Sequence, residues 1–83
     1  MPIEYPLELW DQGIEGRCML KVRVTALGDV DSVLVLESSG HIDFDSSAIR
    51  GAKTLKFSPA RKDGKRIGVW AHVPVHFSKK PRP

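Results

Sequence analysis

Residues 68–77 read GVWAHVPVHF, and in this run apolar residues alternate with polar or small ones. An alternation with a period of two is typical of a β-strand with one buried face. Pro74 lies inside the run and cannot donate a hydrogen bond to a neighbouring strand. Because proline in sheets occurs mainly in edge strands, at strand ends or beside bulges, we expect the last strand to keep one side unpaired. On this interpretation the strand begins at residue 67, and one face carries Ile67, Val69, Ala71, Val73, Val75 and Phe77.

Two earlier segments have the same kind of pattern and are predicted to form a hairpin. From Gly16 onward, apolar side chains alternate with charged ones, so that one face would carry Cys18, Leu20, Val22, Val24 and Ala26. Gly28-Asp29 is a common tight-turn pair, and residues 30–38, VDSVLVLES, return as the second strand. In this second strand valines and leucines compete for the inner face, so the pattern leaves the register open.

Two helices are expected beside these strands. Residues 5–13, YPLELWDQG, predict a short helix that ends at Gly13. The side of this helix facing the core would carry Leu7, Trp10 and Ile14. The second helix is predicted from an apolar stripe at helical spacing, with Asp43 or Asp45 as its N-cap and Pro59 beyond its end. The stripe consists of Phe44, Ala48, Ala52 and Leu55.

The resulting order of elements is helix, strand, strand, helix, strand. It predicts an α+β fold in which helices pack on one face of a three-stranded antiparallel sheet. The 83 residues predict a single domain over residues 1–83, with an ordered core at about residues 5–78 and a disordered tail at 79–83. Residues 60–66, ARKDGKR, are expected to form a basic loop before the last strand.

Composition argues against a membrane span but does not choose a partner. The chain is 41% hydrophobic and 28% charged, and no apolar run approaches the ~18 residues of a membrane helix. A net charge of +3 favours acidic partners, among them nucleic acid, anionic lipid and acidic peptides. Residues 1–4 lack the pattern of a secretory signal. Any export signal would therefore lie outside this chain, which we expect to be part of a longer protein.

No pattern of an active site is found in the sequence. The stretch HIDFD, residues 41–45, alternates potential metal ligands, but aspartates near the start of an amphipathic helix are more often caps. His72 and His76 would lie ~13 Å apart along a strand, too far to share one ion. Nucleophile elbows and glycine-rich phosphate loops are missing, and the single cysteine, Cys18, lies among apolar residues. We therefore expect no enzymatic activity, no cofactor and no metal site.

The predicted edge strand is the best candidate for a functional surface. An exposed edge offers unpaired backbone donors and acceptors, on which another extended chain can add a strand. Apart from Pro74 and the flanking Lys65 and Arg66, this strand carries little that would repel a partner. The alternative is a small basic nucleic-acid-binding module, in which residues 61–66 bind phosphate and Trp70 stacks on a base. No RNA-binding signature accompanies these residues, so we expect no nucleic-acid partner.

From Tyr5 to Phe77 the sequence resembles the C-terminal domain of TonB, the periplasmic energy transducer of Gram-negative bacteria. The matching motifs fall in the family's order: Tyr5-Pro6, Glu15-Gly16 before the first strand, Ser38-Ser39-Gly40 after the second, Phe57-x-Pro59-Ala60 after the helix, and Pro74-Val75-x-Phe77 at the end. Two positions depart from the pattern. Leu9 stands where the family usually has alanine, and Phe44-Asp45 stands where Leu-Asp is common.

The resemblance implies a partner and a location. In this family the last strand accepts the TonB box, a short extended segment of an outer-membrane transporter. The strand would present Ile67, Gly68, Val69, Trp70, Ala71, His72 and Val73. Tyr5 and Pro6 would lie near the transporter plug, and Arg66 belongs to a basic cluster that would orient an acidic residue of the peptide.

The resemblance also implies a role for the whole protein. The domain would lie in the periplasm, and the full-length protein would be anchored in the inner membrane with the ExbB/ExbD complex. It would couple the proton-motive force to the uptake of iron-siderophores, haem or similar nutrients. A TolA-like or stand-alone envelope adaptor is the related alternative. A homodimer through the free edges, by edge contact or strand exchange, also stays open.

Overall fold

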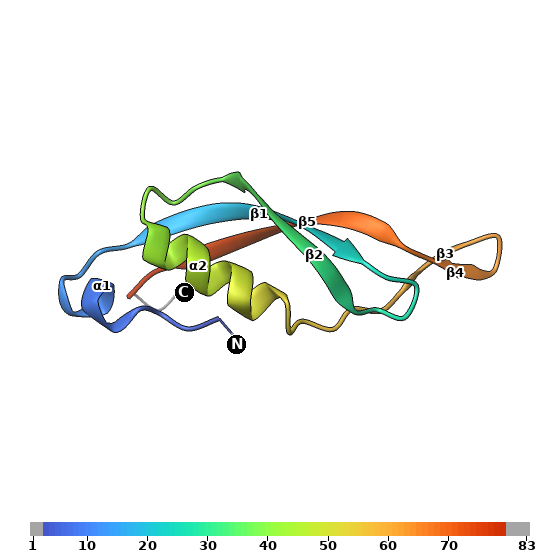
Figure 1. The fold of residues 1–83 in the computed structure, drawn as a ribbon, viewed down its shortest axis with the longest axis horizontal. Helices are drawn as coiled ribbons and strands as arrows, with labels where there is room; N and C mark the ends of the chain where they lie inside the picture. Colours follow the sequence, from blue (N-terminus) through green and yellow to red (C-terminus); the bar gives the residue numbers. More distant parts are fainter. Residues whose placement is uncertain (1–2, 80–83) are drawn as a thin grey trace.

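The computed structural model describes residues 3–79 and has the predicted order of helices and strands, with one short hairpin added (Figure 1). Three strands form an antiparallel sheet in the order β2-β1-β5, and β3 and β4 form a separate hairpin. The elements are α1 (Leu7–Asp11), β1 (Gly16–Val24), β2 (Val30–Glu37), α2 (Ile42–Ala52), β3 (Ala60–Lys62), β4 (Lys65–Ile67) and β5 (Val69–Phe77). The predicted α+β fold with a three-stranded antiparallel sheet is confirmed.

β1 is the central strand, and its side chains alternate between the core and the outer face as predicted. Cys18, Leu20, Val22 and Val24 are at most 3% exposed. The strand pairs with β5 over its whole length and with β2 from Met19 to Val24, so that part of its backbone is paired on both sides. The inner face of this central strand therefore forms one side of the hydrophobic core.

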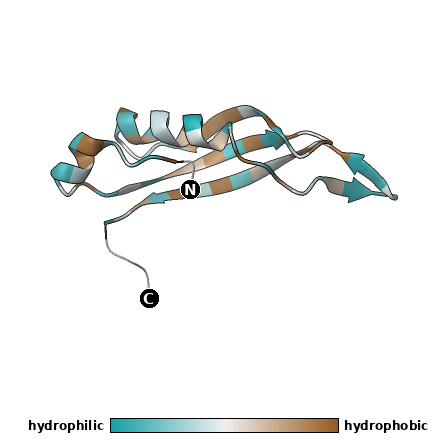
Figure 2. Cartoon of the chain, turned by 90° about the horizontal axis from the view of Figure 1, so that it is seen from below, coloured by the Kyte–Doolittle hydropathy of each residue, from teal (hydrophilic) through white to brown (hydrophobic). Residues whose placement is uncertain are grey.

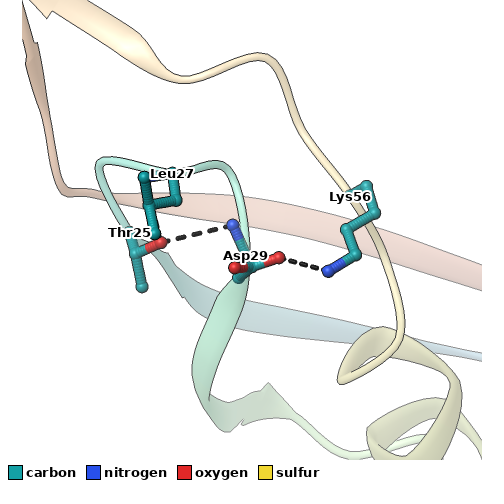
Figure 3. A network of polar contacts seen from close by, with 4 residues as sticks. All are labelled: Thr25, Leu27, Asp29 and Lys56. Carbon is teal, nitrogen blue, oxygen red and sulfur yellow. Dashed lines mark hydrogen bonds and ion pairs between the residues drawn. The ribbon is translucent and has the colours of Figure 1, made fainter.

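The turn between β1 and β2 is held by a glycine and by contacts with the segment after α2. Gly28 has a φ of 90°, which residues with a side chain rarely adopt. Its carbonyl accepts a hydrogen bond of 2.9 Å from the Phe57 N–H, and a Cβ atom at residue 28 would lie 2.1 Å from the Phe57 carbonyl oxygen. The Asp29 N–H donates to the Thr25 hydroxyl, and the Asp29 carboxylate pairs with Lys56 (Figure 3). The predicted hairpin is confirmed.

The structure settles the register of β2. Val33 and Val35 lie opposite buried residues of β1, whereas Leu34 lies opposite Lys21 on the outer face of the sheet. The pairing shifts after Val35, which marks a β-bulge at Leu36. The valines therefore take the inner positions, and both leucines are exposed.

Both helices lie on the same face of the sheet (Figure 2). α2 packs against β1 and β2 through the predicted stripe, in which Phe44, Ala48 and Ala52 are fully buried and Leu55 is half-buried. The outer face of the sheet is not covered by any helix within residues 3–79.

The predicted N-cap of α2 is wrong. The N-cap position is occupied by His41, whose side chain makes no capping hydrogen bond, so Asp43 and Asp45 lie in the first turn. The Asp45 carboxylate instead accepts hydrogen bonds from the Ser39 N–H at 2.9 Å and from the Ser39 hydroxyl at 2.8 Å. Burial tends to raise the pKa of Asp45, but hydrogen bonds from Ser38 and Ser39 outweigh burial and hold this pKa below its usual value. Asp45 therefore ties the preceding loop to the helix.

The predicted core face of α1 is also wrong. Leu9 is the buried residue of this helix, whereas Leu7 and Trp10 are exposed. The helix has only 5 residues, so its single turn presents one side chain to the core. Its predicted end is confirmed, because α1 stops at Asp11 and Gly13 follows with a φ of 70°.

The segment predicted as a basic loop forms a β-hairpin instead. β3 and β4 are joined by Asp63 and Gly64, whose φ angles are 52° and 77°. Two consecutive residues with positive φ are typical of a type I′ turn, which favours the pair Asp-Gly. The Asp-Gly signal was present in the sequence and could have predicted this hairpin.

The hairpin changes where the last strand begins. Ile67 ends β4 and pairs with Ala60, and Gly68 lies between β4 and β5. The predicted continuous strand from residue 67 is therefore wrong at its start, since β5 begins at Val69. β4 and β5 therefore belong to two separate sheets, with Gly68 between them.

The last described residues contact the N-terminal part of the chain. The Ser78 hydroxyl and the Lys79 N–H both donate to the Glu15 carboxylate, at 3.0 and 2.8 Å. The Lys79 ammonium donates to the Trp10 carbonyl at 2.8 Å and lies 4.5 Å from the centroid of the Trp10 ring. Residues 80–83, on which most of the predicted disordered tail falls, lie outside the described residues.

Candidate functional site

The candidate site is the free side of β5. β5 pairs with β1 from Val69 to Phe77, and no strand within residues 3–79 pairs with its other side. Backbone groups on that side have no partner strand, which makes β5 a template for another extended chain.

Burial along β5 divides the strand into a closed end and an open end. At the closed end Val75 and Phe77 are 4% and 3% exposed. Val69, Ala71 and Val73 face the same core but are only half-buried. Their partners on β1 are buried. The remaining exposure of these three side chains therefore arises on the side of β5 that faces away from β1. Residues 69–73 are named the open segment below.

An aromatic cluster covers the closed end. The rings of Phe44 and Phe77 stack with their centroids 4.3 Å apart. The Tyr5 ring meets Phe77, Phe44 and Trp10 edge-on at 5.6, 5.4 and 5.0 Å. The Tyr5 hydroxyl donates to the Ile14 carbonyl, and burial followed by the nearby Glu15 charge raises the pKa of Tyr5. Tyr5 therefore contributes to packing.

The structure does not bring Tyr5 and Pro6 to the open segment. Tyr5 contacts Phe77, which lies about 13 Å along the strand from Val73. Pro6 precedes α1, and its carbonyl accepts the Trp10 N–H at 3.0 Å. Of the residues predicted for the site, those from Val69 to Val73 lie together, whereas Tyr5 and Pro6 flank the opposite end of β5.

The outer side of the open segment carries an aromatic ring and a cation. Trp70 and His72 are exposed on this face, opposite Arg23 and Lys21 of β1. The Lys21 ammonium lies 5.1 Å from the centroid of the Trp70 ring, a distance at which a cation and an aromatic face attract each other. A strand added at this edge would therefore have the Trp70 side chain beside it on the outer face of the sheet.

The β3–β4 hairpin projects from the sheet at the start of β5 and is strongly basic (Figure 1). It carries four exposed cations, of which Arg61 lies opposite Arg66 and Lys62 opposite Lys65. None of these four pairs with a carboxylate within residues 3–79. Like charges directly opposite one another destabilise a hairpin, so this arrangement favours an acidic partner nearby.

The described residues contain no constellation suited to catalysis. Cys18 is buried, and burial followed by the Asp45 charge raises the pKa of its thiol, which disfavours the reactive thiolate. Among residues 3–79 no group of three or more histidine, cysteine, aspartate or glutamate side chains could hold a metal ion. No helix in the same part of the chain has the length and apolar character needed to span a membrane.

The architecture defines the class of protein: a small α+β domain with a three-stranded antiparallel sheet, helices on one face, and a C-terminal strand at the sheet edge. The family model described as Gram-negative bacterial TonB protein C-terminal matches residues 1–78. The chain belongs to this family, which gives the domain a TonB-like role.

Individual relatives support the assignment. The chain is 35% identical over 74 residues to the protein tonB2 of Pseudomonas aeruginosa, a match that covers 89% of this chain and 27% of the relative. It is 34% identical over 77 residues to the protein TonB of Xanthomonas campestris pv. campestris strain B100, covering 93% of this chain and 34% of the relative. The chain thus spans about a quarter to a third of the length of these curated relatives.

A solved structure agrees with the fold. The solution NMR structure of the Pseudomonas aeruginosa TonB CTD superimposes with a TM-score of 0.81 at 29% sequence identity, covering 100% of this chain and 84% of the other. The agreement supports the strand order on which the candidate site depends.

Proposed function

We propose that this domain binds the TonB box of TonB-dependent outer-membrane transporters by β-strand addition to the free side of β5. The observation that carries the proposal is the incomplete burial of the open segment. Val69, Ala71 and Val73 are half-buried opposite β1 residues that are fully buried. A strand placed ~4.8 Å from β5 would cover their free side with its own inward side chains.

Pro74 indicates which backbone groups face the free side. In an antiparallel pair, successive residues direct their N–H and C=O groups alternately toward the neighbour and away from it. Proline is tolerated in an edge strand where its nitrogen points away from the paired strand. With Pro74 in that orientation, Trp70 and His72 direct their N–H and C=O groups toward a docked peptide. These two N–H and two C=O groups can form four hydrogen bonds with the peptide. At about 0.5–1.5 kcal/mol each, they are consistent with modest, reversible binding.

The basic hairpin adds an electrostatic contribution at one end of this edge. Its four cations precede β5 in the chain, and Ile67 and Gly68 lie between the last of them and the strand. An acidic residue of the docked peptide would be attracted there, with Arg66 as the member nearest in sequence to the strand. Because all four side chains are exposed, the gain is no more than about 1 kcal/mol.

The role of the whole protein belongs to the same proposal. Residues 1–83 would form one periplasmic, non-enzymatic domain of a longer protein, anchored in the inner membrane and working with the ExbB/ExbD complex. The protein would transmit energy from the proton-motive force to the uptake of iron-siderophores, haem or similar nutrients. Tyr5 and Pro6 would contact the transporter plug beyond the closed end of β5. Family membership and the free edge support this role.

NMR titration tests the proposal. A synthetic peptide that carries a transporter TonB box should shift the amide signals of residues 69–73 most strongly, with smaller shifts on the basic hairpin. A peptide with the same composition in scrambled order is the control. Shifts that avoid residues 69–73, or equal shifts with the scrambled peptide, would contradict the proposal.

A further inference from the structure

The outer face of the three-stranded sheet carries all the lysine and arginine side chains of its strands. The buried residues of β1 alternate with outward ones, so Arg17, Lys21 and Arg23 lie together on the outer face. Arg17 and Arg23 are exposed, and Lys21 is half-buried. None of the three forms an ion pair with a carboxylate within residues 3–79. A row of cations without acidic partners therefore runs along the central strand.

Acidic residues do not balance this row. Glu8 lies in the first turn of α1, and Asp43 and Asp45 lie in the first turn of α2, so these three belong to the helical side of the sheet. On β2, Glu37 is the one carboxylate paired with an outward residue of β1, and Asp31 lies at a second irregularity of that pairing. The outer face of the sheet is therefore positively charged.

Exposed apolar side chains flank the row of cations. Leu34 of β2 lies opposite Lys21, and Trp70 of β5 lies opposite Arg23. Leu34 and Trp70 are 52% and 46% exposed. The contact between the Lys21 ammonium and the Trp70 ring brings charge and apolar area together. Arg17, Lys21, Arg23, Leu34 and Trp70 are named the cationic face below.

We propose that the cationic face binds the surface of an anionic phospholipid bilayer. Anionic headgroups attract lysine and arginine side chains held near the surface. Tryptophan is enriched at the boundary between headgroups and acyl chains, where leucine also buries apolar area. A soluble acidic partner would complement the cations alone, whereas the bilayer interface also accommodates Leu34 and Trp70. The mixture of charge and apolar exposure on one face therefore favours the bilayer.

This orientation leaves the proposed peptide site accessible. The free backbone groups of an edge strand point along the plane of the sheet and not out of its face. With the cationic face against the headgroups, the free side of β5 would point along the bilayer surface, and both helices would face away from it. Because a cation near an anionic surface strengthens binding only about fivefold, contact through three cations should be reversible and sensitive to salt.

Co-sedimentation with lipid vesicles tests the inference. The chain should bind phosphatidylcholine vesicles that contain phosphatidylglycerol, lose this binding in high salt, and bind pure phosphatidylcholine vesicles poorly. Arg23→Glu reverses one charge of the cationic face and should lower the partition coefficient at least tenfold. Arg50→Glu is the matched control, since it makes the same change at an exposed arginine of α2. It should alter the partition coefficient by less than about twofold, because screening weakens charges far from the surface.

Tryptophan fluorescence shows which face meets the lipid. The chain has two tryptophans, so Trp10→Phe leaves Trp70 as the only reporter. Emission from Trp70 should move to shorter wavelength when vesicles containing phosphatidylglycerol are added, as its ring leaves water. In Trp70→Phe the remaining reporter, Trp10, belongs to α1 on the helical side. Its emission should not move.

Several results would overturn the inference. They are absence of binding to phosphatidylglycerol vesicles at low salt, equal weakening in Arg23→Glu and Arg50→Glu, and an unshifted Trp70 spectrum in vesicle-bound protein. Soluble polyglutamate at the same concentration of negative charge should bind more weakly than the vesicles. Equal binding would overturn the inference in favour of an acidic protein partner. The TonB-box peptide should still bind Arg23→Glu, so a failure here can be distinguished from a failure of the proposed function.

Discussion

Replacement of His72 by proline tests the backbone contribution of the open segment. His72 is exposed, lies opposite Lys21, and has one residue between it and Pro74. The substitution removes the N–H that is inferred to face the docked peptide and places ring methylenes in its position. Because Pro74 already occupies an equivalent orientation in the same strand, β5 should tolerate a second proline without losing its pairing with β1.

The expected loss of affinity follows from the hydrogen bond involved. Removing the bond costs about 1 kcal/mol, and the peptide carbonyl left without a donor costs a further 1–2 kcal/mol, about 2–3 kcal/mol in all. The dissociation constant should therefore rise ~30- to 150-fold. Isothermal titration calorimetry with the TonB-box peptide measures this change. His72→Ala is the matched control, since it removes the imidazole but keeps the N–H, and should weaken binding less than about threefold.

The backbone account would be refuted by either of two results. In the first, His72→Pro binds as tightly as the wild-type domain while remaining folded. In the second, His72→Ala weakens binding as much as His72→Pro, which would show that the imidazole and not the N–H makes the contact. Amide NMR spectra of both variants establish that the fold is retained.

Three further predictions concern the fold and the electrostatics. Gly28→Ala should lower the free energy of unfolding by about 2 kcal/mol or more, because alanine at that positive φ also meets the Phe57 carbonyl; Gly40→Ala, at a φ of 87° with open space around it, should cost less in the same urea titration. The lowered pKa of Asp45 contributes stability above the carboxyl's unfolded pKa, and this contribution is lost as pH falls through the folded pKa. Asp45→Asn should thus lower the free energy of unfolding at neutral pH by no more than about 1 kcal/mol. If the variant were less stable than the wild type by the same amount in acid, the assignment of this contribution to the ionised carboxylate would be contradicted. Lys62→Glu should weaken peptide binding by no more than about fivefold, and a difference that persists in high salt would argue against a screened surface attraction.

Regular alternation made the sheet predictable. In β1 every second residue is apolar and the others are mostly charged, so local pattern and tertiary burial agree. In β2 both faces carry large apolar residues. Only the pairing with β1 shows that Val33 lies on the inner face and Leu34 on the outer face. In α1 one turn cannot express a periodicity, so the sequence did not distinguish Leu9 from Leu7 and Trp10.

The division of β5 into open and closed ends could not be predicted from β5 itself. Val69, Ala71, Val73, Val75 and Phe77 follow one uniform pattern in the sequence. The closed end is created by residues from α2 and from the N-terminal segment, whose aromatic rings meet Phe77. The hairpin before β5, by contrast, could have been predicted, because its Asp-Gly turn signal is local and is present in the sequence.

Amide hydrogen exchange in the free and peptide-bound domain tests the central claim most directly. The account predicts that the Trp70 and His72 amides exchange fast in the free domain and become protected when the TonB-box peptide is bound, while the neighbouring amides that face β1 are slow in both states. Protection of Trp70 and His72 in the free domain, or fast exchange of both in the complex, would contradict strand addition at this edge.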